Sequence, residues 1–131
     1  MNLRLSWLAA LICALAMIAL LSPGLARWRP EYAELPQATR EWFRTRTLTP
    51  AAQARFNFSN CCDHADVVDT KFRIDKTTGN DQWWWLNGTQ WERVPDDIIH
   101  WDQHHPEGKA ILFISPIHKL PVCFFPPESG G

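Results

Sequence analysis

The strongest constraint on the fold is an aromatic run with a turn signal inside it, Trp83-Trp84-Trp85-Leu86-Asn87-Gly88-Thr89-Gln90-Trp91. Asn followed by Gly accepts the positive φ angles of a two-residue turn, so Asn87-Gly88 predicts a tight β-hairpin. With this turn, Trp84 faces Trp91 across the strands, and an aromatic pair contributes roughly 0.5–1.5 kcal/mol beyond area burial. We therefore expect the face with Trp84 and Trp91 to lie in the core.

Side chains alternate along a strand, so Trp83, Trp85, Gln90 and Glu92 share the opposite face of the hairpin. This pattern predicts a partly exposed surface that binds an envelope protein, a peptide or a glycan, because tryptophan offers a large flat contact area. The alternative is that N-terminal helices cover this face and bury both tryptophans, as is usual for apolar side chains.

The chain predicts one α+β domain with a helical preface at 34–56 and a β-rich part at 66–126. Thr49 before Pro50 predicts the N-cap of a short helix that ends at Phe56. Further segments are expected as a helix at 36–46, as strands at 67–74, 110–114 and 122–125, and as the hairpin at 82–94. We expect short helices packed on a strongly bent antiparallel β-sheet or open barrel of about five strands.

The first 26 residues resemble a secretory signal peptide. Arg4 precedes an apolar run from Leu5 to Leu21, and Gly24-Leu25-Ala26 provides a cleavage site with small residues. Cleavage leaves 27–131 as a small periplasmic or secreted domain. The alternative is an uncleaved anchor in the inner membrane with the domain facing the periplasm, although the apolar run is at the short limit for a bilayer span.

The mature chain has three cysteines, Cys61, Cys62 and Cys123, and an odd number in an oxidising compartment leaves one thiol unpaired. Adjacent cysteines rarely pair, so we expect a disulfide from Cys62 or Cys61 to Cys123. Closing a loop of about 60 residues contributes roughly 4 kcal/mol. The sequence alone leaves the choice between the two adjacent cysteines open.

Two chemical alternatives involve the same segment. A free Cys61 or Cys62 activated by His64 is one arrangement for a thiol enzyme, but no third group or oxyanion donor accompanies it, so we expect no enzyme. A metal set of Cys61, His64 and one of His104, His100 or His105 is the other, but the paired spacing of metal motifs is missing, so we expect no cofactor. The formal net charge of −1, with acids and bases interspersed, excludes a basic nucleic-acid surface.

Several short motifs together resemble a group of small exported proteobacterial proteins of uncharacterised function. The resemblance covers most of 40–127 and is carried by Trp42-Phe43, Cys61-Cys62-Asp63, Ala65-Asp66, Val94-Pro95-Asp96 and Cys123-Phe124. It implies export and a disulfide, and it transfers no activity. A further cysteine often follows the Ala-Asp dipeptide in that group, and here the position holds Val67.

The predicted function is that of a non-enzymatic, exported binding or envelope-associated module with an aromatic hairpin surface. The alternatives are a thiol- or metal-dependent protein built on Cys61, Cys62 and His64, and a membrane-tethered structural protein. The binding module requires an exposed aromatic face on the hairpin, whereas the thiol- or metal-dependent protein requires an unpaired cysteine close to His64.

Overall fold

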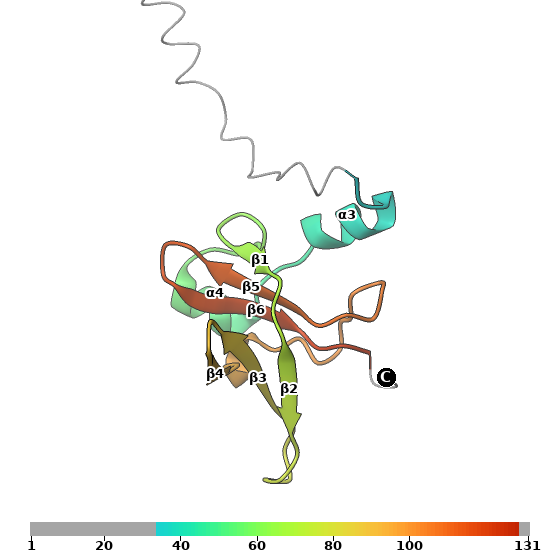
Figure 1. Ribbon diagram of the computed structural model, residues 1–131. Helices are drawn as coiled ribbons and strands as arrows, with labels where there is room; N and C mark the ends of the chain where they lie inside the picture. Colours follow the sequence, from blue (N-terminus) through green and yellow to red (C-terminus); the bar gives the residue numbers. More distant parts are fainter. Residues whose placement is uncertain (1–33, 129–131) are drawn as a thin grey trace, which may run out of the picture.

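The computed structural model describes residues 34–128, which form an α+β domain with two helices and two antiparallel three-stranded sheets (Figure 1). The elements are α3 (Gln37–Arg44), α4 (Pro50–Phe56), β1 (Asp66–Val68), β2 (Phe72–Asp75), β3 (Gln82–Asn87), β4 (Gln90–Arg93), the 3-10 turn η1 (Asp96–Ile98), β5 (Ile111–Ser115) and β6 (Leu120–Phe125). The predicted α+β class is confirmed. The sheet prediction needs correction, because six strands form two sheets, and neither sheet is closed.

The predicted signal or anchor segment at 1–26 lies outside the described residues. Within 34–128, neither helix has the length and apolar character that crossing a bilayer requires.

Helix α4 forms where the sequence predicts it. Thr49 is the N-cap, and its hydroxyl accepts a hydrogen bond from the backbone N–H of Ala52 at 3.1 Å. The same hydroxyl donates to the backbone carbonyl of Asp97, which ties the start of α4 to η1. Asn57 ends the helix in the left-handed conformation, with φ of 59°. The local sequence therefore determines both ends of this helix.

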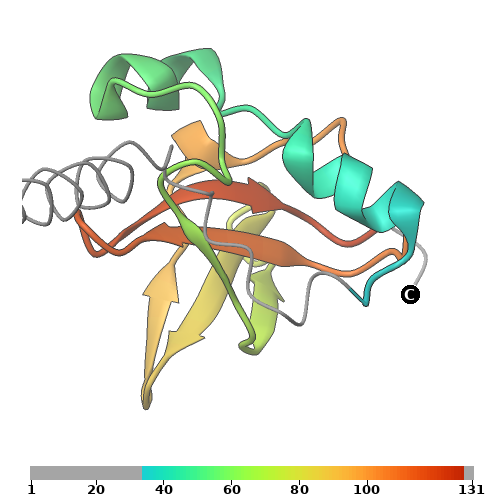
Figure 2. The same ribbon diagram turned by 90° about the horizontal axis from the view of Figure 1, so that it is seen from above.

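Strands β5 and β6 form the middle layer of the domain. Figure 2 shows both helices on one side of this hairpin and the β2-β3-β4 sheet on the other. The ring of Phe125 lies 4.9 Å from that of Trp42 on the helix side, whereas Phe124 lies 5.5 Å from Trp83 of the second sheet. A strand that is buried on both faces shows a continuous apolar run instead of alternation, as β6 does.

The predicted strand at 67–74 divides into two strands that belong to different sheets. β1 pairs with β5, and β2 pairs with β3 (Figure 1). The polar segment 69–71 carries the chain between them, and the hydroxyl of Thr70 donates to the carbonyl of Leu86 at 2.6 Å. The sequence predicts one strongly bent sheet, but the chain instead passes from one sheet to the other at 69–71.

Strands β3 and β4 form the predicted hairpin, but the turn lies one residue further along the chain. Asn87 pairs with Gln90, so Gly88 and Thr89 are the central residues, and Gly88 has a φ of 61°. Glycine with positive φ at the first central position is what a type II′ turn requires. The side chain of Asn87 donates to Glu92 at 2.9 Å.

The hairpin buries the opposite face from the one predicted. Trp85 is 5% exposed and Trp83 packs against the core, whereas Trp84 and Trp91 are partly exposed on the other face. Because the turn lies one residue further along, the pairing register between β3 and β4 differs by two residues from the predicted register. Each face of the hairpin therefore keeps the predicted residues, but Trp91 pairs with Leu86 instead of Trp84. Phe124 decides which face is buried, because it lies beneath Trp83.

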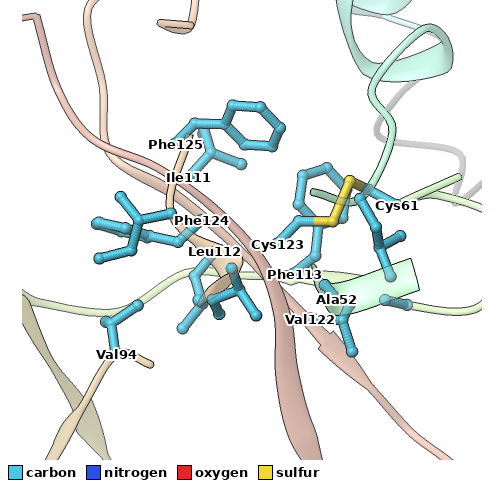
Figure 3. Close-up of a cluster of buried hydrophobic side chains, with 14 of the residues drawn as sticks. Ala52, Cys61, Val94, Ile111, Leu112, Phe113, Val122, Cys123, Phe124 and Phe125 are labelled. Atoms are coloured by element: carbon cyan, nitrogen blue, oxygen red, sulfur yellow. A yellow bond between two sulfur atoms is a disulfide. The ribbon is translucent and has the colours of Figure 1, made fainter. Parts of the chain in front are cut away.

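The hydrophobic core lies between the β5–β6 hairpin and the two layers that pack on it, the helices on one side and the β2-β3-β4 sheet on the other. Figure 3 shows the buried side chains gathered around β5 and β6, including Val94, which directly follows β4, Ala52 and Cys61 from the helical side, and Leu112, Phe113 and Val122. All six of these residues are at most a few per cent exposed, which makes the β5–β6 hairpin the structural centre of the domain.

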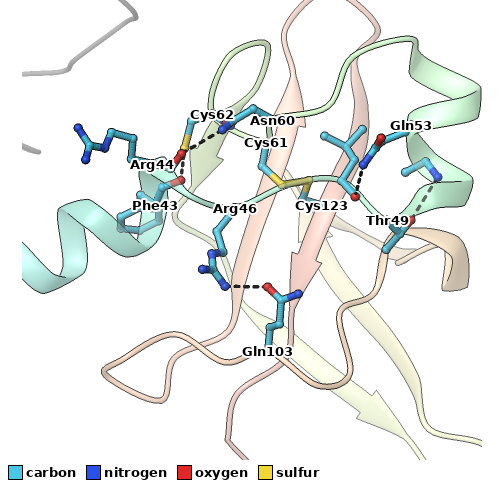
Figure 4. The surroundings of a disulfide bond; sticks show 12 residues. Phe43, Arg44, Arg46, Thr49, Gln53, Asn60, Cys61, Cys62, Gln103 and Cys123 are labelled. Atoms are coloured by element: carbon cyan, nitrogen blue, oxygen red, sulfur yellow. Dashed lines mark hydrogen bonds between the residues drawn. A yellow bond between two sulfur atoms is a disulfide. The ribbon is translucent and has the colours of Figure 1, made fainter.

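Helix α3 docks onto this centre through Trp42. Its ring lies 4.9 Å from the ring of His105 and 4.9 Å from that of Phe125. Arg46 follows the helix, and its guanidinium lies 5.0 Å from the Trp42 ring and donates to Gln103 at 2.7 Å (Figure 4). Stacking and a hydrogen bond together therefore hold the helix end against the loop that contains Gln103.

Candidate functional site

The outward side of the β2-β3-β4 sheet carries a mixed aromatic and cationic surface, which we name the Trp–Arg face. The strand register places Arg73, Trp84 and Arg93 in one row across the sheet, and it places Leu86 and Trp91 in the next. Lys71 extends the second row, because its carbonyl accepts the backbone N–H of Leu86 at 3.0 Å. The Trp–Arg face therefore consists of Lys71, Arg73, Trp84, Leu86, Trp91 and Arg93.

Arg73 is the centre of the Trp–Arg face. Its guanidinium carbon lies 4.6 Å from the ring centre of Trp91 and 5.3 Å from that of Trp84. Arg73 is nevertheless exposed, and both tryptophans are partly exposed. A guanidinium that stacks on aromatic rings keeps its in-plane N–H donors available for a carboxylate or phosphate.

The charges on the Trp–Arg face are mostly positive. Arg93 forms an exposed ion pair with Asp96 at 2.7 Å, but Arg73 and Lys71 form no ion pair with any residue of 34–128. Asp75 is the one acid on the same side of β2, and hydrogen bonds from Thr77 hold its pKa below the ordinary value, with a smaller contribution from Arg73. The surface is therefore arranged to attract an anion.

The predicted aromatic surface faces the other way. Trp85 is buried, which contradicts its predicted exposure, whereas Trp83 is partly exposed but packs against the core. Gln90 and Glu92 are exposed at the turn end of the hairpin, where Glu92 accepts a hydrogen bond from Asn87. The four predicted residues thus share one face, but that face is directed at Phe124.

The disulfide joins Cys61 to Cys123 with a Cα–Cα distance of 6.1 Å, and both residues are fully buried. It fastens the segment after α4 to β6 (Figures 3 and 4). Of the two pairings that the sequence allows, the one through Cys62 is wrong. The side chain of Cys61 points to β6, whereas that of Cys62 points to the end of α3 (Figure 4).

Cys62 is a free, partly buried thiol. Its Sγ donates to the backbone carbonyl of Phe43 at 3.0 Å, and Asn60 accepts its backbone N–H at 2.8 Å. Burial, and to a smaller extent the carboxylate of Asp63, raises the pKa of the Cys62 thiol to about 11. A reactive thiol needs its pKa shifted downward, so the environment of Cys62 favours a structural role.

His100 lies beside the disulfide. Its backbone N–H donates to the carbonyl of Phe124 at 2.9 Å, and its ring stacks on Phe125 with 4.4 Å between ring centres. One ring nitrogen of His100 and the sulfurs of Cys61 and Cys123 all lie within 4.8 Å of one another. The Nε2 atom of His100 is buried and has no hydrogen-bond partner within 34–128.

The predicted metal set does not come together around one point. Cys61 is in the disulfide, His64 is exposed with its ring 4.9 Å from that of Phe58, and the Nδ1 of His104 lies 3.1 Å from the carbonyl of Pro126. His100, one of the three alternative histidines, is the one that lies beside Cys61.

Sequence reasoning missed Arg73, and it named His100 only as one of three alternative histidines for a metal set. Period-two alternation from Lys71 to Arg73 was a usable signal for one cationic side of the strand. No sequence signal selected His100 over His104 and His105, because its position depends on the bridge between Ile99 and Phe124.

Comparison with protein-family models, with curated proteins and with solved structures returns no significant match to this chain.

Proposed function

We propose that this domain is an exported, non-enzymatic binding module whose Trp–Arg face holds an acidic segment of a partner protein. The observation that carries the proposal is the guanidinium of Arg73, which stacks on Trp84 and Trp91 and has no acid within ion-pair distance in 34–128. Tryptophan and arginine are also the residues most enriched where protein interfaces derive their binding energy. The buried disulfide supports export, since such bonds persist in oxidising compartments.

The spacing of the cations favours an extended polypeptide. Lys71 and Arg73 are two residues apart on one side of the chain, which corresponds to about 6.6 Å along a strand. Alternate side chains of an extended acidic peptide repeat at the same distance. Strand β2 is also an edge strand among the described residues, so a partner strand can add beside it through main-chain hydrogen bonds (Figure 1).

The test measures binding of a peptide with alternating glutamate and threonine to the mature domain by calorimetry or fluorescence anisotropy. Arg73→Gln removes the stacked charge, and we expect it to weaken binding by about tenfold or more. Arg44→Gln is the matched control, because Arg44 is also exposed but lies on α3. Binding of the wild type should weaken with added salt, since both partners are charged at a surface.

Two results would contradict the proposal. One is equal loss of affinity in the Arg73→Gln and Arg44→Gln proteins, which would indicate unspecific attraction. The other is binding of polygalacturonate, a carboxylate-bearing glycan, without binding of the peptide. That outcome would reassign the Trp–Arg face to an acidic glycan.

A further inference from the structure

The two disulfide sulfurs and the ring of His100 form a group of potential metal donors. None of these residues belongs to the Trp–Arg face. Cys61, Cys123 and His100 come from three separate segments, and all three are buried. Two molecules of a small thiol such as glutathione can reduce the disulfide: they supply two electrons and two protons, form their own disulfide and leave two protein thiols. Their thiolates and one imidazole would then lie together on the helix side of β6.

We propose that the dithiol form of this domain binds one thiophilic cation such as Zn²⁺ through Cys61, Cys123 and His100. Metal binding and the disulfide exclude each other, because both use the same two sulfur atoms.

The donor atoms fit a small cation. Ligands of a tetrahedral zinc ion at about 2.0–2.3 Å from the metal lie roughly 3.3–3.8 Å from one another. Every donor of the group already lies within 4.8 Å of the others, so modest rotation of the side chains brings them to that spacing. Two thiolates and one imidazole are also a donor set that zinc proteins use.

The state of His100 is a second, independent observation. His100 is 6% exposed and its Nε2 atom has no hydrogen-bond partner in the described chain, although buried polar atoms are normally paired. The backbone hydrogen bond to Phe124 holds the residue next to Cys123.

Oxidation would release the ion. When oxidised glutathione accepts two electrons from the two thiolates, the S–S bond between Cys61 and Cys123 forms and two protons are taken up by the resulting glutathione thiolates. The ion then loses two of its three protein ligands. The inferred site is therefore open to metal only while the protein is reduced.

The test uses the mature domain reduced and refolded without oxygen, with Zn²⁺ affinity measured by competition with a chromophoric chelator. We expect one Zn²⁺ per reduced chain and none per oxidised chain. His100→Phe keeps an aromatic ring against Phe125 but removes the donor, and it should weaken Zn²⁺ binding by about tenfold or more. Adding oxidised glutathione to the loaded protein should release Zn²⁺ in step with disulfide formation.

Two matched controls separate this site from its neighbours. Cys62→Ser tests a chelate of the adjacent cysteines, and His64→Ala tests the exposed histidine of the same segment; both variants should retain full Zn²⁺ affinity. The thermal midpoint of each variant in the oxidised state shows whether its fold is intact. Loss of binding in either control, unchanged binding in His100→Phe, or a reduced chain that stays unfolded in excess Zn²⁺ would overturn the inference.

Discussion

The pKa values of the two buried histidines in this domain are set by burial more than by neighbouring charge. The pKa of His100 and that of His105 are both lowered, and desolvation is the largest cause in each case. The charge of Asp102 raises the pKa of His100, and that of Glu107 raises the pKa of His105, but neither effect is as large as that of burial. Both imidazoles are consequently neutral where they stack, His100 on Phe125 and His105 beside Trp42.

The lowered pKa values of His100 and His105 lead us to predict that the free energy of unfolding depends on pH. Their pKa values are near 6.5 in the unfolded chain and lower in the folded domain, so the unfolded chain binds more protons below that pH. Their full contribution is present above pH 6.5, and the free energy of unfolding decreases as the pH falls through that value toward the folded pKa. Urea unfolding at about pH 7.5 and 5.5 measures the decrease.

The variant His100→Phe isolates one of the two titrating groups. It preserves the stack on Phe125 and should reduce the difference in unfolding free energy between the two pH values. The two acids with lowered pKa values, Asp75 and Glu107, titrate below this window and leave the comparison intact. A pH dependence equal to that of the wild type would contradict the assignment to His100.

At the scale of the element, the β3–β4 hairpin separates a core face from a surface face. Trp85 projects toward β6 and is buried, whereas Trp91 projects outward against Arg73. The two tryptophans lie on neighbouring strands and differ mainly in the face they occupy. Alternation along a strand sorts them, but only the layer beneath the sheet determines which of them becomes core.

A pair of substitutions tests this orientation. Trp85→Ala leaves a large cavity beneath the hairpin, and we expect it to lower the free energy of unfolding by about 3–5 kcal/mol. Trp91→Ala removes a partly exposed ring, and it should cost less than half as much while weakening partner binding at the Trp–Arg face. Urea unfolding and the peptide titration measure both effects. Equal destabilisation by the two substitutions would show that the Trp–Arg face is also core.

At the scale of the whole molecule, the domain consists of three layers joined by one covalent link. The helices and the β2-β3-β4 sheet cover opposite faces of the β5–β6 hairpin (Figure 2). The disulfide connects the helical layer to β6 across a sequence separation of 62 residues. A domain of this size has a limited core, so this cross-link represents a large share of its stability.

Removing the disulfide should therefore destabilise the domain strongly. The double substitution Cys61→Ala and Cys123→Ala opens the loop, and the chain-entropy relation gives a loss of about 4 kcal/mol in the free energy of unfolding. Cys62→Ala is the matched control and should cost much less, because it removes only one weak S–H hydrogen bond. Urea unfolding without reductant compares the three proteins, and an equal loss in the control would contradict the structural role of the cross-link.

The elements whose signals lie within a few residues were predictable from the sequence. Thr49 and Pro50 predict the start of α4, and Asn87-Gly88 predicts a hairpin to within one residue of its turn. The sequence also determined that one of two adjacent cysteines bonds to Cys123, and that two groups of hairpin side chains lie on opposite faces. Hydrogen-bond geometry and side-chain alternation are local, so a short stretch of sequence carries them.

Only the tertiary structure decided which alternatives are realised. Packing of Phe124 beneath Trp83 determines the buried face of the hairpin and leaves Arg73 on the outside. The path of the chain beside β6 places Cys61 next to Cys123 and adds His100, and no pattern within 61–100 encodes that approach. Both outcomes depend on contacts between residues far apart in the chain, which form only when the three layers pack together.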